Sequence, residues 1–166
     1  MAKVSTEYDA LFMSCMKVLE SMGWDPSGSV IENILVGTYT SEYGSWQFYT
    51  EIFSDEALMV VRSILGETTP QKYMKEMVEL IARCNDGLPR ANLEIDVDSG
   101  LISCKSYLDL EGADIETMNK FGILEPLIAR MLNANFATVD IFIDAIRNVA
   151  SGDLSALEAD RSTLET

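Results

Sequence analysis

The order in which hydrophobic periodicity changes along this chain limits its fold more than any single motif does. A helical period near the N-terminus is followed by three β-rich runs, a second helical period, a hairpin and a long helical C-terminal third. Apolar residues at helical spacing indicate one buried helix face, whereas alternation indicates a strand with one buried face. The order predicts an α+β fold built on an antiparallel five-stranded sheet with helices.

Turn residues set the limits of the predicted elements. Gly23 ends the first helical stripe, and Thr69 followed by Pro70 begins the second, because proline is favoured at the first helical position. Asp114 is a candidate cap for the third helical region. The predicted elements are helices at 8–23 and 70–84, strands at 34–40, 46–53 and 58–65, a hairpin about Ser99-Gly100, and a helical region over 113–150.

The hairpin admits two registers. If Ser99-Gly100 forms a two-residue loop, Ile95 pairs with Cys104 and the apolar residues share one face. If Asp98 joins a three-residue loop, Lys105 moves to the buried face. Alternation favours the first register.

The C-terminal third leaves a second choice open. Asn133 and Asn135 are the expected break, so residues 113–150 form either two helices or one long bent helix. From Ser151 the chain becomes polar and acidic. We therefore expect a single domain over 1–150 and an acidic polar tail over 151–166, which forms either a short frayed helix or a disordered segment.

The acidic composition excludes several classes of partner. The 27 acidic and 12 basic residues give a net charge of −15, which repels nucleic-acid phosphates and anionic lipid headgroups. The N-terminus lacks the apolar segment of a signal peptide, and the longest nearly apolar run, 123–132, is too short to span a membrane. We expect a cytoplasmic protein that binds neither nucleic acid nor membrane.

Residues that carry chemistry are sparse. The chain has no histidine, so the usual base for a serine or cysteine nucleophile is missing. Glu94, Asp96 and Asp98 alternate before a turn, but further calcium ligands at the required spacing are absent. The three cysteines occupy apolar positions typical of buried thiols. We therefore expect no catalytic residues, no metal and no cofactor.

Two segments resemble a known family. The second hairpin, over 88–96 and 98–100 to 106–108, is similar to that of the YbjN family, and 46–53 resembles its aromatic strand. The order of elements also resembles the type III secretion chaperone-like fold. The resemblance implies a bacterial cytoplasmic protein grouped with regulators of sensory transduction, with no agreed catalytic residues. Secretion chaperones of this fold are acidic homodimers that wrap an extended client, although this chain has a longer helical C-terminal region.

Apolar side chains beyond one core indicate a binding surface. Tyr49 and Phe53 lie on the second face of their strand, and Met59 and Val61 of the next strand are expected on that same face. A dimer partner, a client peptide or the long C-terminal helix would cover it. We expect a homodimer and a protein or peptide client. The predicted protein-binding residues are Trp46, Tyr49, Phe53, Met59, Val61, Phe136 and Phe142. The chain is expected to be a non-catalytic regulator or chaperone-like adaptor; the alternatives are a small-molecule-sensing domain and an enzyme without a recognisable motif.

Overall fold

The structure is a computed structural model that describes residues 10–24, 30–31 and 33–163. The helices are α1 (Ala10–Ser21), α2 (Met74–Asn85), α3 (Ile115–Lys120), α4 (Leu124–Ser151) and α5 (Ala156–Thr163). The strands are β1 (Val30–Ile31), β2 (Ile34–Ser41), β3 (Gly44–Phe53), β4 (Leu58–Thr68), β5 (Asn92–Ile95) and β6 (Leu101–Asp109). The predicted α+β class is confirmed. Tyr8, where the first helix was predicted to begin, lies outside the described residues.

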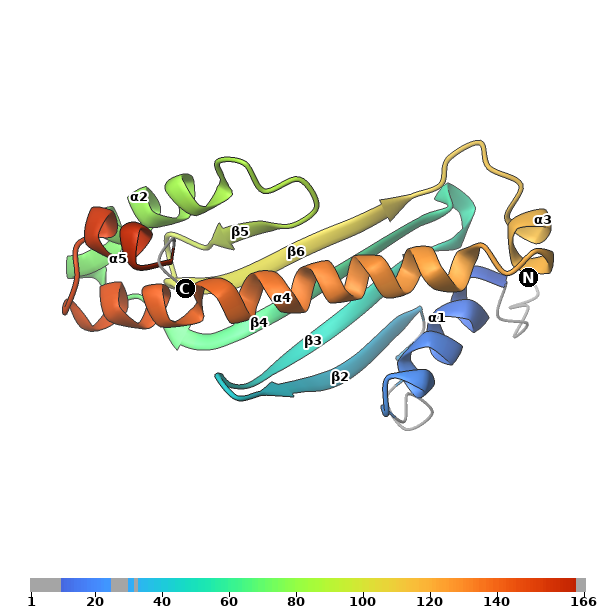
Figure 1. Cartoon of the computed structure of the whole chain (residues 1–166), viewed down its shortest axis with the longest axis horizontal. Coiled ribbons are helices and arrows are strands. Elements are labelled where there is room, and N and C mark those ends of the chain that lie inside the picture. The colour runs from blue at the N-terminus through green and yellow to red at the C-terminus, as the bar shows by residue number, and fades with distance from the viewer. Residues whose placement is uncertain (1–9, 25–29, 32, 164–166) are drawn as a thin grey trace, which may run out of the picture.

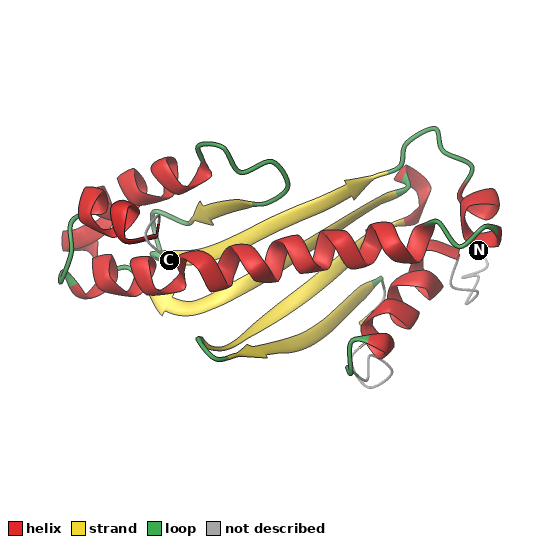
Figure 2. Cartoon of the chain, in the orientation of Figure 1, coloured by secondary structure: helices red, strands yellow, loops and turns green. Residues whose placement is uncertain are grey.

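The strands form one antiparallel sheet in the order β1-β2-β3-β4-β6-β5, to which the two-residue β1 is an addition that the sequence did not predict. The long helix α4 runs along one face of this sheet, with α1 and α3 near one end and α2 and α5 at the other (Figures 1 and 2). No helix in the described part of the chain is long and apolar enough to cross a membrane.

The face of the sheet beneath α4, called the inner face below, holds the core. Alternate residues of β3 are buried there, including Trp46 and Phe48, and they meet the apolar side of α4. Met59 and Val61 of β4 are fully buried on this same face, since Ile52 pairs with Met59 and Thr50 with Val61. The prediction that Met59 and Val61 share the face of Tyr49 and Phe53 is therefore wrong.

Helix α4 is unbroken over 28 residues, so the break expected at Asn133 and Asn135 does not occur. The C-terminal third forms separate helices, but the first interruption is at Phe121–Ile123, where Gly122 has a φ of +67°. Asn135 does not end the helix, because its amide bonds across to the sheet instead of to its own backbone. Its Oδ1 accepts from Ser63 Oγ at 2.6 Å, and its Nδ2 donates to the Cys104 carbonyl at 2.9 Å.

The β5–β6 hairpin adopts neither predicted register. Ile95 pairs with Ile102, and a longer loop closes the strands. Within it, Asp96 Oδ1 accepts hydrogen bonds from the backbone N–H groups of Asp98 and Ser99. The observed pairing is shifted by two residues from the favoured register. Because side chains alternate with a period of two, the buried and exposed faces of the two strands are still as predicted for that register.

Residues 156–163 are part of the folded unit, not of a polar tail. Helix α5 packs against α2 and α4, and Ala156 and Ala159 are fully buried. Its first N–H groups find acceptors: Glu76 Oε2 accepts from the Ala156 N–H at 2.9 Å, and Ser155 forms a capping box with Glu158. The short helix expected from 151 onward is therefore present at 156–163, but the expected fraying or disorder is wrong for these residues.

The cap of α3 makes stability depend on pH. Asp114 accepts hydrogen bonds from the side chain and the backbone N–H of Thr117, which lower the pKa of its carboxyl below the usual value. A group whose pKa is lower in the folded state stabilises the fold above its unfolded pKa, and the stabilisation is lost as pH falls through the folded pKa.

We therefore predict that Asp114→Asn, which keeps an uncharged acceptor, lowers thermal stability at neutral pH and that this difference shrinks as the solution is acidified. Thermal melts of both proteins across a pH series measure it. A difference that stays constant with pH would show that the charge of Asp114 does not stabilise the helix.

Candidate functional site

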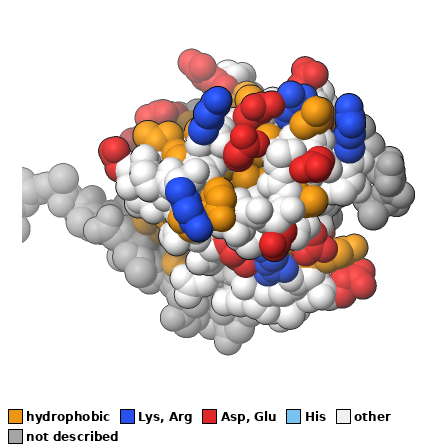
Figure 3. All heavy atoms as spheres, turned by 90° about the vertical axis from the view of Figure 1, so that its left-hand side faces the viewer, with side chains coloured by type: hydrophobic (Ala, Val, Ile, Leu, Met, Phe, Trp, Pro, Cys, Tyr) orange, Lys and Arg blue, Asp and Glu red, His pale blue; other side chains and the backbone are white. Residues whose placement is uncertain are grey.

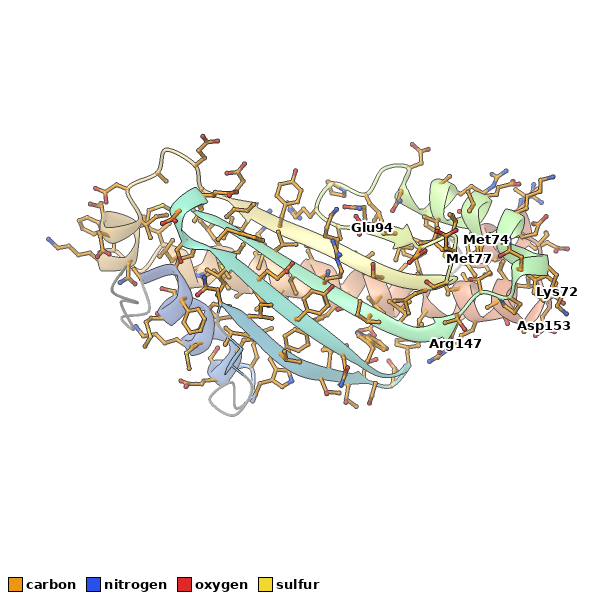
Figure 4. The ribbon with its side chains drawn as sticks, turned by 180° about the vertical axis from the view of Figure 1, so that it is seen from behind. Lys72, Met74, Met77, Glu94, Arg147 and Asp153 are labelled. Carbon is orange, nitrogen blue, oxygen red and sulfur yellow. The ribbon has the colours of Figure 1, made fainter. Side chains whose placement is uncertain are left out.

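The face of the sheet opposite α4, called the outer face below, is not covered by any described helix. Figure 4 views the molecule from this side, with the strands in front of α4. Alternation and strand pairing place there Val36, Tyr49, Phe53, Val60, Arg62, Ile64, Glu94, Lys105 and Tyr107. Phe53 is 41% exposed and Tyr107 is 62% exposed. Large side chains at such exposure are typical of contact surfaces.

A small ionic group on the outer face joins the edge strand β5 to β6 and β4. Glu94, labelled in Figure 4, forms an ion pair with Lys105, and its second oxygen is 3.5 Å from Arg62 Nη2. All three side chains are partly exposed, so the pairs contribute little to stability. Glu51 of β3 and Asp109 of β6 lie on the same face, so the outer face carries no excess of positive charge. What it offers a partner is its exposed aromatic side chains.

The structure separates the predicted protein-binding residues into two groups. Tyr49 and Phe53 lie on the outer face, as predicted. Trp46, Phe136 and Phe142 are buried on the inner side, together with Met59 and Val61. These five side chains contact the chain's own core, and none of them presents a binding surface.

An aromatic cluster explains why Phe136 is unavailable to a partner. Its ring stacks on Tyr39 with centroids 4.4 Å apart and meets the edge of Phe48 at 5.0 Å. Tyr39 in turn donates its hydroxyl to Asp140 Oδ2 at 2.8 Å, and burial together with this bond raises the pKa of the phenol to about 12. The cluster fastens α4 to β2 and β3.

The acidic side chains and cysteines of the described residues do not gather into a cluster that could hold a metal ion. No group of three potential metal-ligating side chains occurs among them. Cys15, Cys84 and Cys104 are buried and free, which confirms their predicted burial, and burial raises the pKa of each thiol to about 12. Neutral buried thiols are poor nucleophiles. Glu94 also lies apart from Asp96, whose carboxylate caps the hairpin loop.

A cavity of about 470 Å³, called the edge cavity below, opens beside the end of β5. It is lined by Leu88, Pro89, Arg90, Ala91, Asn92, Tyr107, Leu108, Leu127, Arg130 and Met131. This cavity was not predicted from the sequence. One feature of the sequence could have indicated a binding role for Arg130: it has no acidic residue three or four positions away in an otherwise acidic protein. Only the fold brings Arg90, from a loop, to the same cavity.

The described residues at the end of the molecule formed by α2 and α5 form no extended surface that is apolar or of a single charge sign. Figure 3 faces this end and shows acidic, basic and hydrophobic side chains interspersed, without an extended area of one kind. Surfaces of this mixed character are ordinary for a protein in water. The outer face and the edge cavity are therefore the two candidate sites.

Comparison of the sequence with protein-family models and with curated proteins gave no match. The functional assignment therefore depends on the geometry of these two sites.

Proposed function

We propose that this chain is a non-catalytic protein-binding domain, a regulator or chaperone-like adaptor, which contacts its partner through the outer face. The observation that carries the proposal is that none of the described helices covers a face that holds Tyr49, Phe53 and Tyr107. An antiparallel sheet needs only one buried face, but aromatic residues on the other mark an interface more often than an ordinary solvated surface.

The surroundings of the titratable groups support a non-catalytic role. The carboxylates of Glu94 and Asp96 accept hydrogen bonds or form ion pairs within the chain, and the thiols are buried. Enzymes usually hold acids, bases or nucleophiles with perturbed pKa values in a cleft. Among the described residues lining the edge cavity, none is a carboxylate or a thiol.

The order of elements supports a family assignment within the same proposal. If the two-residue β1 is left aside, the elements follow one another as helix, three strands, helix, two strands and helices. This order resembles that of the YbjN family and of the secretion chaperone-like fold. A cytoplasmic, homodimeric regulator fits that resemblance and the net charge of −15. The alternative of a small-molecule sensor is less well supported, because the edge cavity opens onto the surface beside exposed Arg90 and Arg130.

Photo-cross-linking in the native cell tests the proposal. Benzoylphenylalanine in place of Phe53 on the outer face is expected to give discrete cross-linked polypeptides. The matched control replaces Ile141, which is 54% exposed on the opposite side of the molecule, with the same residue. Cross-links that are equal at the two positions, or missing at Phe53, would contradict the proposed contact.

Self-association through the outer face is a separate expectation. We predict a dimer in equilibrium sedimentation at micromolar concentration, and we predict that Phe53→Asp shifts it to monomer, because a carboxylate in an apolar contact loses its hydration without gaining a partner. A wild-type chain that remains monomeric would remove the homodimer from the proposal.

A further inference from the structure

The edge cavity lies where one edge of the sheet is left unpaired. Strand β5 pairs with β6 only from Asn92–Lys105 to Ile95–Ile102, while β6 continues to Asp109 (Figure 1). Beyond Lys105, no described strand lies on the β5 side of β6. An unpaired edge of this kind is a template for another extended chain.

The direction of the backbone groups on this edge follows from two hydrogen bonds. The Leu101 carbonyl accepts from Asp96 N–H, on the β5 side, and the Leu110 N–H donates to the Ala57 carbonyl, on the β4 side. Because these directions alternate along a strand, odd-numbered residues of β6 point their N–H and C=O groups away from β4. Tyr107 therefore presents both groups to the open edge, beside the cavity that it lines. No backbone hydrogen bond occupies them within the described part of the chain.

The cavity beside this edge combines an apolar floor with two cations. Leu108, Leu127 and Met131 supply apolar surface, and Arg90 and Arg130 supply guanidinium groups. The volume of about 470 Å³ lies in the range of small-ligand pockets and also accommodates a few side chains of an extended segment, so the choice of occupant rests on the strand edge beside it.

Arg90 and Arg130 differ from the other four arginines of the chain in their ion pairing. Arg62, Arg83 and Arg147 form ion pairs, and Arg161 interacts electrostatically with Glu158. Arg90 and Arg130 have no acidic partner among the described residues. Although the chain has 27 acidic residues, the two arginines without an acidic partner among the described residues line the same cavity. A guanidinium group is well suited to bind a carboxylate through two hydrogen bonds.

We propose that the edge cavity binds an extended segment of a partner protein, which pairs with β6 at Tyr107, places an apolar side chain against Leu108 and Met131, and offers an Asp or Glu carboxylate to Arg90 and Arg130. This inference depends on the proposed protein-binding function and names the chemistry of the partner. Phosphate groups would also suit the arginines, but a nucleic acid carries one at every nucleotide, so the net charge of −15 repels it more strongly than it repels a segment with a single carboxylate. A nucleic acid also lacks the peptide N–H and C=O groups that pair with a strand edge.

An array of synthetic heptapeptides of random sequence, probed with the purified labelled chain, tests the specificity. Bound peptides are expected to be enriched in Asp or Glu next to an apolar residue. In the Arg90→Gln/Arg130→Gln variant this enrichment is expected to be lost, and the affinity of the best peptide to fall about tenfold or more. Lys75→Gln is the control, because Lys75 is an exposed lysine on α2, away from the cavity. An array without acidic enrichment, or with enrichment unchanged in the double variant, would overturn the proposal.

Two further measurements with the best peptide test how it binds. Methylation of alternate backbone nitrogens is expected to abolish binding, because strand addition requires those N–H groups. Decanoate, an apolar chain with one carboxylate, is expected not to displace the peptide at millimolar concentration. Full binding of the methylated peptide, or displacement by decanoate, would show a site for small carboxylates instead. Cross-linking at Phe53 is independent of this edge, so a failed peptide test with intact Phe53 cross-links would reject the cavity and leave the proposed function standing.

Discussion

Replacing Asn135 with alanine is expected to lower the free energy of unfolding by about 2 to 5 kcal/mol. The side chain is fully buried at the centre of α4, where it accepts from Ser63 Oγ and donates to the Cys104 carbonyl. Alanine removes the partner of these groups in a place that water does not reach, and an unsatisfied buried polar group is costly. Urea unfolding at equilibrium gives the measurement.

Asn133→Ala is the matched control, since Asn133 lies on the exposed side of the same helix. Its cost should stay below about 0.5 kcal/mol. If the two alanine variants lost equal stability, the buried network would have no special role in holding α4 against β4 and β6.

Replacing Phe48 with alanine is expected to cost about 3 to 5 kcal/mol, because the ring is fully buried and its removal leaves a cavity. Gly37 on the paired strand makes room for this ring: a Cβ at Gly37 would lie 2.5 Å from the Phe48 ring. Gly37→Ala alone is therefore expected to cost about 1 to 3 kcal/mol through overpacking.

The two substitutions are expected to be coupled, because the overpacking at Gly37 disappears once the ring is gone. A double-mutant cycle in urea measures the coupling, with Gln47→Ala on the exposed side of β3 as the control. Strictly additive costs would contradict the close contact between Gly37 and the Phe48 ring.

The strands were predictable because their signal is local. Alternation and turn residues placed runs at 34–40, 46–53 and 58–65, close to the observed β2, β3 and β4. Helix α5 was predicted only as a short frayed helix or a disordered segment, since its buried positions are the small Ala156 and Ala159, which give little hydrophobic periodicity. The break between helices was predicted at Asn133 and Asn135 and not at Phe121–Ile123 for a different reason. The amide of Asn135 bonds to the sheet and leaves the helix intact, and a sequence does not show that partner.

Assigning residues to faces required pairing that no single strand specifies. The run from Leu58 to Leu65 is apolar at most positions and lacks clear alternation, so its own pattern does not say which face Met59 occupies. The short 3-10 turn Ser54–Glu56 sets the register with β3, and with it the burial of Met59 and Val61. The edge cavity could not be predicted from the sequence, because its lining comes from a loop, the end of a strand and one side of α4.

The position of α4 in the chain has a consequence during synthesis. All the strands leave the ribosome before α4, and at about 5 to 20 residues per second the delay between Asp109 and Ser151 is roughly 2 to 8 seconds. Throughout that interval α1 and α2 are present but α4 does not yet cover Trp46 and Phe48, and the inner face of the nascent sheet is open to aggregation. The acidic charge of the chain opposes such encounters before the last helices close the core.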